Sequence, residues 1–299
     1  MTSLPTVAVR RPVVADTRAE LAAALSAARS AGHRVALVPT MGALHVGHAS
    51  LMREARQAAG PHATVVASVF VNPMQFGPNE DLARYPRSLD ADLEVCAANG
   101  VDLVFAPGVR DMYPDGETLV SVDPGRLGTV LEGATRPTHF RGVLTVVAKL
   151  IGLVRPDVAV FGEKDYQQLV LIRRMVDDLC LGVEIVGGRT VREADGLALS
   201  SRNAYLDHHE RALALALSEA LRAGADAAAG GAEAVLAAAH DVLQRAADVE
   251  VDYLALTSPG LGDPPPSGEA RLLVEARVGS TRLLDNIAVT LGDNDKKGN

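Results

Sequence analysis

Along the first two thirds of the chain, short apolar runs alternate with stretches whose apolar residues recur at helical spacing. A short apolar run bounded by turn residues is typical of a buried strand, whereas apolar positions three and four apart indicate a helix. The predicted strands are residues 35–38, 64–71, 101–106, 157–161 and 183–186. The predicted helices are residues 47–59, 89–98, 142–154 and 166–179, preceded by an alanine-rich helix that starts at the capping-box pair Thr17 and Glu20 and ends near Gly32. Strands separated by helices predict a parallel, doubly wound sheet.

The pattern changes after Arg189. Two alanine-rich helical stretches follow, near residues 209–229 and 232–247, and then three strand-like runs at 249–256, 271–278 and 283–291. Helices followed by consecutive strands indicate an α+β unit. We therefore predict an α/β fold in which residues 1–189 form a Rossmann-like doubly wound parallel sheet and residues 190–299 form a smaller C-terminal α+β domain.

Composition narrows the class of protein. A chain of 299 residues fits about two domains by the usual prior. The formal net charge is −8, which argues against a basic surface that grips nucleic acid. The chain has no Trp, 5 Tyr and 5 Phe, so aromatic platforms for single-stranded nucleic acid are not expected either. Nucleic acid is therefore excluded as a partner.

The sequence also predicts a cytoplasmic protein without membrane contact. No apolar run approaches the ~18–20 residues that span a bilayer, and residues 1–17 lack the unbroken apolar stretch of a signal peptide. The two cysteines, Cys96 and Cys180, lie far apart without CxxC spacing, which favours free thiols in helices over a disulfide.

Unusual residues gather after the strands, where open parallel sheets bind their ligands. The segment after the first predicted strand contains His45 and His48 on either side of Gly47, which is expected to open a helix. A helix N-terminus with close backbone approach suits phosphate, and two imidazoles three residues apart can donate hydrogen bonds to phosphoryl oxygens. A metal site and a pair of ordinary helix-start histidines remain alternatives at this point.

Two further segments follow strands in the same way. Lys164 comes after a strand and Gly162, where its ammonium could meet phosphate or simply be solvated. Asp165 could cap the next helix or accept a hydrogen bond from a ribose. Gln75 and Gln168 carry both donors and acceptors, which suits a substrate with hydroxyl and carboxylate groups, although surface amides are the alternative for each.

A fourth candidate is the run Ser200-Ser201-Arg202-Asn203 just beyond the predicted domain boundary. Two hydroxyls and a guanidinium could clamp a polyphosphate in a mobile loop, or the run could be a turn with a surface arginine. The GxxxxGK[ST] phosphate loop, HExxH, GxSxG and EF-hand motifs are absent from the sequence. Any use of a nucleotide must therefore depend on the histidine segment.

These segments together resemble the pantoate–β-alanine ligases, or pantothenate synthetases, of the HIGH/KMSKS nucleotidyltransferase superfamily. The resemblance rests on four strings in order, VPTMGALHVGH, FVNPMQF, FGEKDYQQ and SSRN, and runs from about Val35 to Ile287. THFRGV and LLDN fit the same family. The HxGH motif alone has low specificity, whereas the ordered strings have high specificity.

The resemblance implies an ATP-dependent ligase. Such an enzyme condenses (R)-pantoate with β-alanine through a pantoyl adenylate and releases AMP and pyrophosphate, in pantothenate and coenzyme A biosynthesis. It implies catalytic roles for His45, His48, Lys164 and Arg202, and pantoate contacts for Gln75 and Gln168, with Gln75 also near β-alanine. The implied ATP contacts are Met41, Gly42, Ala43, Leu44, His45, Val46, Gly47, His48, Gly162, Glu163, Lys164, Asp165, Val191, Leu199, Ser200, Ser201 and Arg202.

The resemblance further implies Mg²⁺, a homodimer, and a nucleotide- and pantoate-binding first domain with a lid-like second domain. This sequence departs from the family pattern at two places. Val46 stands where the family often has Glu, and residues 89–92 are less acidic than in some relatives. We therefore expect ATP and water to hold the Mg²⁺ and assign no protein ligand to the metal. Competing hypotheses are a cofactor nucleotidyltransferase, which would ignore β-alanine, and a nucleotide-binding module without catalysis.

Overall fold

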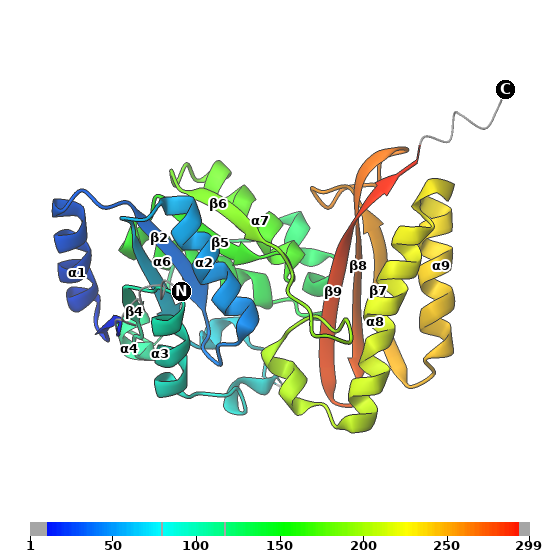
Figure 1. The fold of residues 1–299 in the computed structure, drawn as a ribbon, viewed down its shortest axis with the longest axis horizontal. Helices are drawn as coiled ribbons and strands as arrows, with labels where there is room; N and C mark the ends of the chain where they lie inside the picture. The colour runs from blue at the N-terminus through cyan, green and yellow to red at the C-terminus, as the bar shows by residue number, and fades with distance from the viewer. Residues whose placement is uncertain (1–10, 79, 117, 293–299) are drawn as a thin grey trace, which may run out of the picture. The chain divides into compact units, whose positions relative to one another are not determined.

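The structure is a computed structural model that describes residues 11–78, 80–116 and 118–292. Residues 1–10, which belong to the segment tested above for a signal peptide, lie outside these ranges. The chain forms two compact units, whose elements Figure 1 traces in chain order. The first unit comprises Met1–Pro124, Thr138–Gly162 and Ile172–Gly188, and the second comprises Gly125–Pro137, Glu163–Leu171 and Arg189–Asn299. Neither unit is therefore one continuous stretch of chain.

The first unit contains a six-stranded sheet in which every strand pair is parallel. The strand order is β1-β4-β3-β2-β5-β6. The strands are β1 (Val13–Ala15), β2 (Val35–Thr40), β3 (Thr64–Val69), β4 (Leu103–Phe105), β5 (Val158–Gly162) and β6 (Glu184–Gly188). The predicted doubly wound parallel sheet is confirmed. Strand β1 was not predicted, because three residues are too few to show a periodicity.

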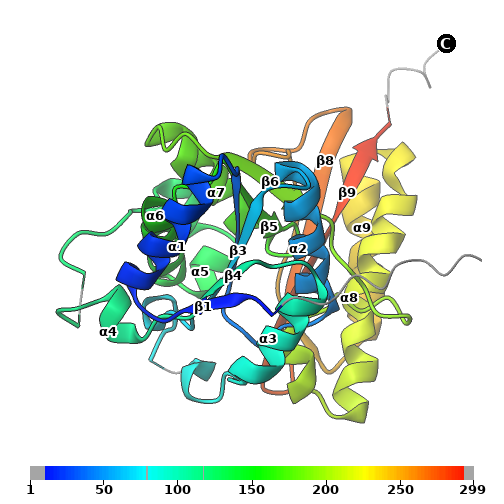
Figure 2. The ribbon, with the colours of Figure 1, turned by 60° about the vertical axis from the view of Figure 1, so that its left-hand side comes forward.

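Helices cover both faces of this sheet. Figure 2 shows α1 and α6 on one side and α2 and α3 on the other. On the α2 side, Met52 packs with Val38, Val65 and Val160 of the strands. The helices of this part of the chain are α1 (Arg18–Ser30), α2 (Val46–Ala59), α3 (Leu89–Ala98), α4 (Val109–Met112), α6 (His139–Val154) and α7 (Tyr166–Asp178), with the 3-10 turns η1 (Pro73–Gln75) and η2 (Asp81–Ala83). The predicted capping box of Thr17 and Glu20 at the start of α1 is confirmed.

The sheet reverses its direction of growth between β2 and β5. From β2 the chain adds β3 and then β4 on one side, whereas β5 and β6 lie on the other side. The two central strands pair directly through Ala36 with Val158 and Leu37 with Ala159. In open α/β sheets, ligands bind at the carboxyl ends of the strands that flank such a reversal. Thr40, the last residue of β2, therefore lies at the edge where a ligand is expected.

The second unit contains an antiparallel three-stranded sheet in the order β7-β8-β9. One face packs against two helices, and Leu221 and Val235 meet Leu272 and Val274 there. The opposite face carries Leu273, which packs with Tyr166. The elements are η3 (Arg126–Thr129), α5 (Glu132–Thr135), η4 (Ser201–Tyr205), α8 (His208–Asp226), η5 (Ala228–Gly230), α9 (Ala232–Arg245), β7 (Val249–Thr257), β8 (Gly268–Val278) and β9 (Thr281–Leu291). The predicted α+β character of the C-terminal region is confirmed.

One prediction about the cysteines is wrong. Cys96 lies buried in α3, and burial raises the pKa of its thiol to about 12, so it is a structural thiol. Cys180 is exposed and lies beyond the end of α7 with a φ of 52°, outside any helix. Both cysteines are free. Within the described ranges, no helix is both long enough and apolar enough to cross a membrane.

The second unit buries a carboxyl group in its sheet. Glu275 of β8 has no exposed surface, and its Oε2 accepts a hydrogen bond from Thr135 Oγ1 at 3.2 Å. Its Oε1 lies 3.5 Å from Arg282 Nε. Burial raises the pKa of Glu275 to about 7, and the negative charge of Glu132 adds to the shift.

We expect Glu275 to make the protein less stable as the pH rises. Because the pKa is higher in the folded state than the ordinary 4.5, its stabilising contribution is complete below pH 4.5 and is lost through pH 7. The loss is on the order of 3 kcal/mol of unfolding free energy. Glu275→Gln, which stays neutral, should flatten this decline. Urea unfolding of the wild type and of Glu275→Gln at pH 5.5 and 8.5 tests this expectation. An equal change in the free energy of unfolding between the two pH values in both proteins would show that Glu275 is not the group responsible.

Candidate active site

The segment between β2 and α2 is held by its neighbours before the histidines begin. Thr40 Oγ1 donates a hydrogen bond to Ser68 O at 2.6 Å and accepts one from the Gly42 N–H at 3.2 Å. Gly42 has a φ of +85°, and a Cβ atom there would lie 2.8 Å from Asp92 Oδ2. Both its backbone conformation and its closeness to a carboxylate therefore require glycine.

Asp92 fixes the residues that follow Gly42. Its Oδ2 accepts a hydrogen bond from the Ala43 N–H at 3.2 Å, and its Oδ1 accepts one from the Leu44 N–H at 2.7 Å. Burial raises the pKa of Asp92, and the two N–H donors oppose that shift. Ala43 and Leu44 thus present their backbone N–H groups to Asp92 in this structure, and both oxygens of Asp92 are engaged by the loop.

His45 and His48 cap helix α2 reciprocally. His45 is the N-cap, and its Nδ1 accepts a hydrogen bond from the Gly47 N–H at 3.1 Å. His48 Nδ1 in turn accepts one from the His45 N–H at 3.3 Å, and the ring centroids lie 4.1 Å apart. A neutral imidazole whose Nδ1 accepts carries its proton on Nε2, so each Nε2 is a donor. The backbone N–H of Gly47, at the start of this helix, is thus already engaged by His45.

Gln75 lies in a buried polar network of the first unit. Its side chain is held by Asn72, whose Nδ2 donates to Gln75 Oε1 at 3.2 Å, and by Met41, whose Sδ lies 2.9 Å from Gln75 Nε2. Its carbonyl accepts a hydrogen bond from His139 Nδ1 at 2.9 Å. Tyr113 donates to Asn72 Oδ1 at 2.8 Å. Gln75 is 8% exposed, so it is not an ordinary surface amide.

This network depends on a close approach of two backbones. Asn72 Nδ2 also donates to Gly142 O at 3.1 Å, which ties η1 to helix α6. A Cβ atom at Gly142 would collide with the carbonyl of Met74. Burial raises the pKa of Tyr113 to about 12, so its hydroxyl remains a donor at neutral pH. The position of Gln75 is therefore fixed from several sides.

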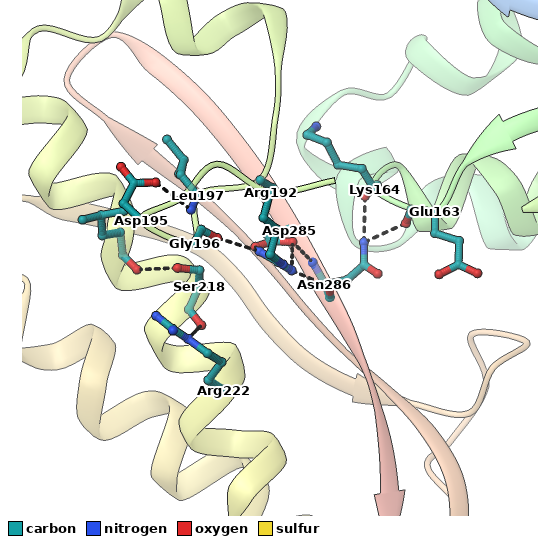
Figure 3. Close-up of polar contacts among 12 residues, drawn as sticks. Glu163, Lys164, Arg192, Asp195, Gly196, Leu197, Ser218, Arg222, Asp285 and Asn286 are labelled. Carbon is teal, nitrogen blue, oxygen red and sulfur yellow. Dashed lines mark hydrogen bonds and ion pairs between the residues drawn. The ribbon is translucent and has the colours of Figure 1, made fainter. Parts of the chain in front are cut away.

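The second unit holds the other charged candidates. The Lys164 side chain is 18% exposed, and its Nζ lies 3.4 Å from Asp165 Oδ1. Glu163 and Lys164 both accept hydrogen bonds at their carbonyls from Asn286 Nδ2, at 3.0 and 2.7 Å. Figure 3 shows the Lys164 side chain directed away from Asn286. The contact therefore fixes the backbone of Lys164 while its ammonium extends elsewhere.

The two glutamines after Lys164 differ in their surroundings. Gln167 is buried, and its Nε2 donates to Leu127 O at 2.7 Å and Val130 O at 2.8 Å. Its Oε1 accepts from the Glu132 N–H at 3.1 Å. Gln167 is thus a structural tie within the second unit. Gln168 is partly exposed, which leaves it the better candidate for contact with a substrate.

The segment from Arg189 to Arg202 is a folded loop. Residues Arg192 and Ala198 form an isolated β-bridge, and the Leu199 N–H donates to Val191 O at 3.0 Å. Ser200 then caps η4, because its Oγ accepts from the Arg202 N–H at 3.3 Å. The run predicted as a polyphosphate clamp therefore forms a short capped 3-10 helix.

The structure divides the candidate residues between the units. His45, His48 and Gln75 belong to the first, and Lys164, Gln168 and Arg202 belong to the second. Asp92, Asn72 and Asn286 hold candidate residues, although sequence reasoning named none of the three as a candidate. Asn72 stands in the FVNPMQF string, Asn286 in the LLDN string and Asp92 in the stretch of residues 89–92, but none of these signals showed that the side chain would hold a neighbouring segment.

Comparisons with known proteins identify one group of relatives. The sequence profile of the family described as pantoate-beta-alanine ligase matches residues 13–288. A protein from Nocardioides sp. named pantothenate synthetase is 61% identical, with 96% of this chain and 88% of the relative covered. One of the same name from Thermobifida fusca is 57% identical, with 97% of this chain and 100% of the relative covered.

Solved structures agree with these relatives. The crystal structure of pantothenate synthetase from Thermus thermophilus superposes with a TM-score of 0.86 at 48% identity, covering 92% of this chain and 98% of that one. The pantoate-beta-alanine ligase from Francisella tularensis, complexed with beta-gamma ATP and beta-alanine, has a TM-score of 0.75 at 33% identity. Its coverage is 92% of this chain and 97% of that one.

Proposed function

Because the chain belongs to the pantoate–β-alanine ligase family, we propose that the candidate residues described above carry out the two half-reactions of that chemistry. The chain is an ATP-dependent ligase that condenses (R)-pantoate with β-alanine to pantothenate. The reaction proceeds through pantoyl adenylate and releases AMP and pyrophosphate. What remains to be assigned is the work of individual side chains.

In the first half-reaction, a carboxylate oxygen of pantoate attacks the α-phosphorus of ATP. The new bond joins that oxygen to phosphorus, and the bond to the bridging oxygen breaks, so pyrophosphate leaves with the electron pair. Negative charge grows on the phosphoryl oxygens, and donors aimed at it lower the barrier. We assign this role to the Nε2–H groups of His45 and His48 and to the side chains of Lys164 and Arg202.

In the second half-reaction, the neutral amine of β-alanine attacks the carbonyl carbon of the adenylate. The C–N bond forms, AMP leaves with the electron pair of the C–O bond, and the nitrogen releases a proton to water. We propose that Gln75 and Gln168 bind pantoate, with Gln75 also near β-alanine. A buried, fixed amide such as Gln75 orients hydroxyl and carboxylate groups at low entropic cost.

The proposed ATP contacts are those that the family resemblance implies. In the first unit they are Met41, Gly42, Ala43, Leu44, His45, Val46, Gly47, His48 and Gly162. In the second unit they are Glu163, Lys164, Asp165, Val191, Leu199, Ser200, Ser201 and Arg202. Since Ala43 and Leu44 donate their N–H groups to Asp92, we assign them contact through other atoms. Val46 is 62% exposed, so a larger side chain would fit there in relatives.

Mg²⁺, a dimer and a cellular location complete the proposal. The described part of the chain has no group of three or more His, Cys, Asp or Glu residues able to hold a metal ion. Because residues 89–92 are less acidic than in some relatives, we assign no protein ligand and propose that the phosphate oxygens of ATP and water would hold Mg²⁺. We also propose that the protein is a homodimer, as the family resemblance implies, and sedimentation equilibrium tests this. Because the reaction needs ATP, we propose that the protein is cytoplasmic, and cell fractionation tests that.

The observation that carries this proposal is the reciprocal capping of His45 and His48 at the carboxyl end of β2. The test uses pantoate labelled with ¹⁸O in its carboxylate. We expect one labelled oxygen in AMP and one in pantothenate, with pyrophosphate released only when pantoate is present. Formation of ADP, unlabelled AMP, or pyrophosphate release without pantoate would overturn the mechanism. A nucleotidyltransferase would ignore β-alanine.

A further inference from the structure

Two consecutive residues of β9, Asp285 and Asn286, hold two separate loops of the second unit. They are 4% and 3% exposed. In the sheet register, Asp285 pairs with Val274 and Asn286 with Leu273. Because successive side chains of a strand point to opposite faces, the two residues reach in opposite directions. Figure 3 shows Asp285 meeting Arg192 and Asn286 meeting Glu163 and Lys164.

Asn286 fixes the backbone around Lys164. Its Nδ2 donates to the carbonyls of Glu163 and Lys164, at 3.0 and 2.7 Å, and its Oδ1 accepts from Arg271 Nε at 2.7 Å. Arg271 in turn lies over the ring of Tyr166, 4.1 Å from its centroid. One amide that holds two successive carbonyls sets the direction in which the intervening Lys164 side chain leaves the backbone.

Asp285 fixes the loop that leads to Arg202. Its two oxygens accept from Arg192 Nη1 and Nη2 at 2.6 and 2.9 Å, in the bidentate geometry that constrains a guanidinium most strongly. Arg192 also donates to Gly196 O at 3.1 Å, across its own loop. Asp285 Oδ1 accepts the Asn286 N–H at 2.7 Å as well, which joins the two anchors.

We propose that Asp285 and Asn286 are positioning residues that set the Lys164 segment and the Arg202 segment for the same reaction. The inference rests on the proposed roles of Lys164 and Arg202 at the phosphates. A displacement of about 1 Å at such a group can cost about 100-fold in rate. Loss of the Asn286 amide is therefore expected to act on turnover through Lys164.

The decisive variant is Asn286→Asp in the full-length protein. Aspartate keeps the size of the side chain and its acceptor for Arg271, but its carboxylate cannot donate to the two carbonyls. We expect kcat to fall about 100-fold with KM for ATP changed only a few-fold. The matched control is Thr281→Val in the same strand, since Thr281 is 3% exposed and its Oγ1 has no hydrogen-bond partner among the described residues. Its kcat should stay within about twofold.

A double-mutant cycle with Lys164→Met separates positioning from a purely structural role. If Asn286 acts through Lys164, the double variant loses little more kcat than Lys164→Met alone, while thermal unfolding shifts equally in both backgrounds. If the fold-loss of kcat in the double variant equalled the product of the two single losses, the inference would be overturned. Wild-type kcat in Asn286→Asp would also overturn it. Wild-type kcat in Lys164→Met would instead remove the proposed role of Lys164 and the inference with it.

A second variant covers failure of Asn286→Asp to fold. Arg192→Lys keeps a positive charge beside the buried Asp285 carboxylate, so the fold is expected to tolerate it. It breaks the bidentate contact to Asp285, and its loss of kcat should be non-additive with Arg202→Ala. Additive losses there would show that the loop from Arg192 does not position Arg202.

Discussion

Replacing His45 with asparagine is expected to lower kcat by about 100- to 1000-fold while leaving helix α2 intact. Asparagine is among the strongest N-cap residues, so its side chain can accept the Gly47 N–H that His45 Nδ1 now accepts. It supplies no imidazole, and the Nε2–H donor toward developing phosphate charge is lost. His45→Asn therefore separates the cap of the helix from the chemistry of the ring.

His45→Ala is the matched comparison for this variant. It loses both the donor and the cap, so we expect the same loss of kcat together with about 1 kcal/mol less stability. Single-turnover formation of the adenylate and thermal unfolding measure the two effects separately. If His45→Asn kept near wild-type turnover, the ring of His45 would be only a cap and the catalytic assignment would fail.

Replacing Lys164 with methionine is expected to cost a similar factor in kcat with a small change in stability. Methionine keeps most of the length and the apolar stem of lysine but removes the ammonium, which at the phosphates would act as a point charge. The lost ion pair with Asp165 spans 3.4 Å and is partly exposed, so it contributes little to folding. Pyrophosphate release and pantothenate formation should fall together, because the first half-reaction is affected.

Lys149→Met is the control for Lys164→Met. Lys149 lies with its Nζ 5.2 Å from the centroid of the Tyr113 ring, a contact expected to contribute about 0.5–1 kcal/mol to stability. We expect its turnover to stay within about twofold of wild type. Comparable losses of kcat in both variants would indicate a general response to removing positive charge and would contradict a specific role for Lys164.

The alternation of apolar runs and helical stretches was enough to predict five of the six strands of the parallel sheet, because each of those five is a short apolar run followed by a Gly or Pro within a few residues. The positions of His45 and Lys164 directly after strands likewise placed them at strand ends without any structure. Asp92 could not be found in this way. Its contact with Ala43 and Leu44 depends on how α3 packs, and no local pattern encodes such packing.

The helix N-terminus illustrates a second limit. An HxGH string predicts a helix start, but not that the side chains of His45 and His48 engage the backbone N–H groups there. The outcome depends on two rotamers that the sequence leaves open. The same limit applies to the division of the chain into units, in which segments of the second unit interrupt the first. Residues 163–171 follow a strand of the first unit but belong to the second, because of tertiary contacts such as that of Tyr166 with Leu273.

The early position of these second-unit segments in the chain has a consequence for synthesis on the ribosome. Leu127 and Tyr166 are made early, yet they pack against Leu273 and Leu261, which emerge more than ninety residues after Tyr166. Until the last strands leave the exit tunnel, these apolar side chains lack the partners that the C-terminal strands and their connections supply, and they are open to non-native association. A fragment that stops at Gly188 would keep them in that state permanently. We therefore regard the nascent chain, more than the finished enzyme, as the form most exposed to aggregation and to chaperones.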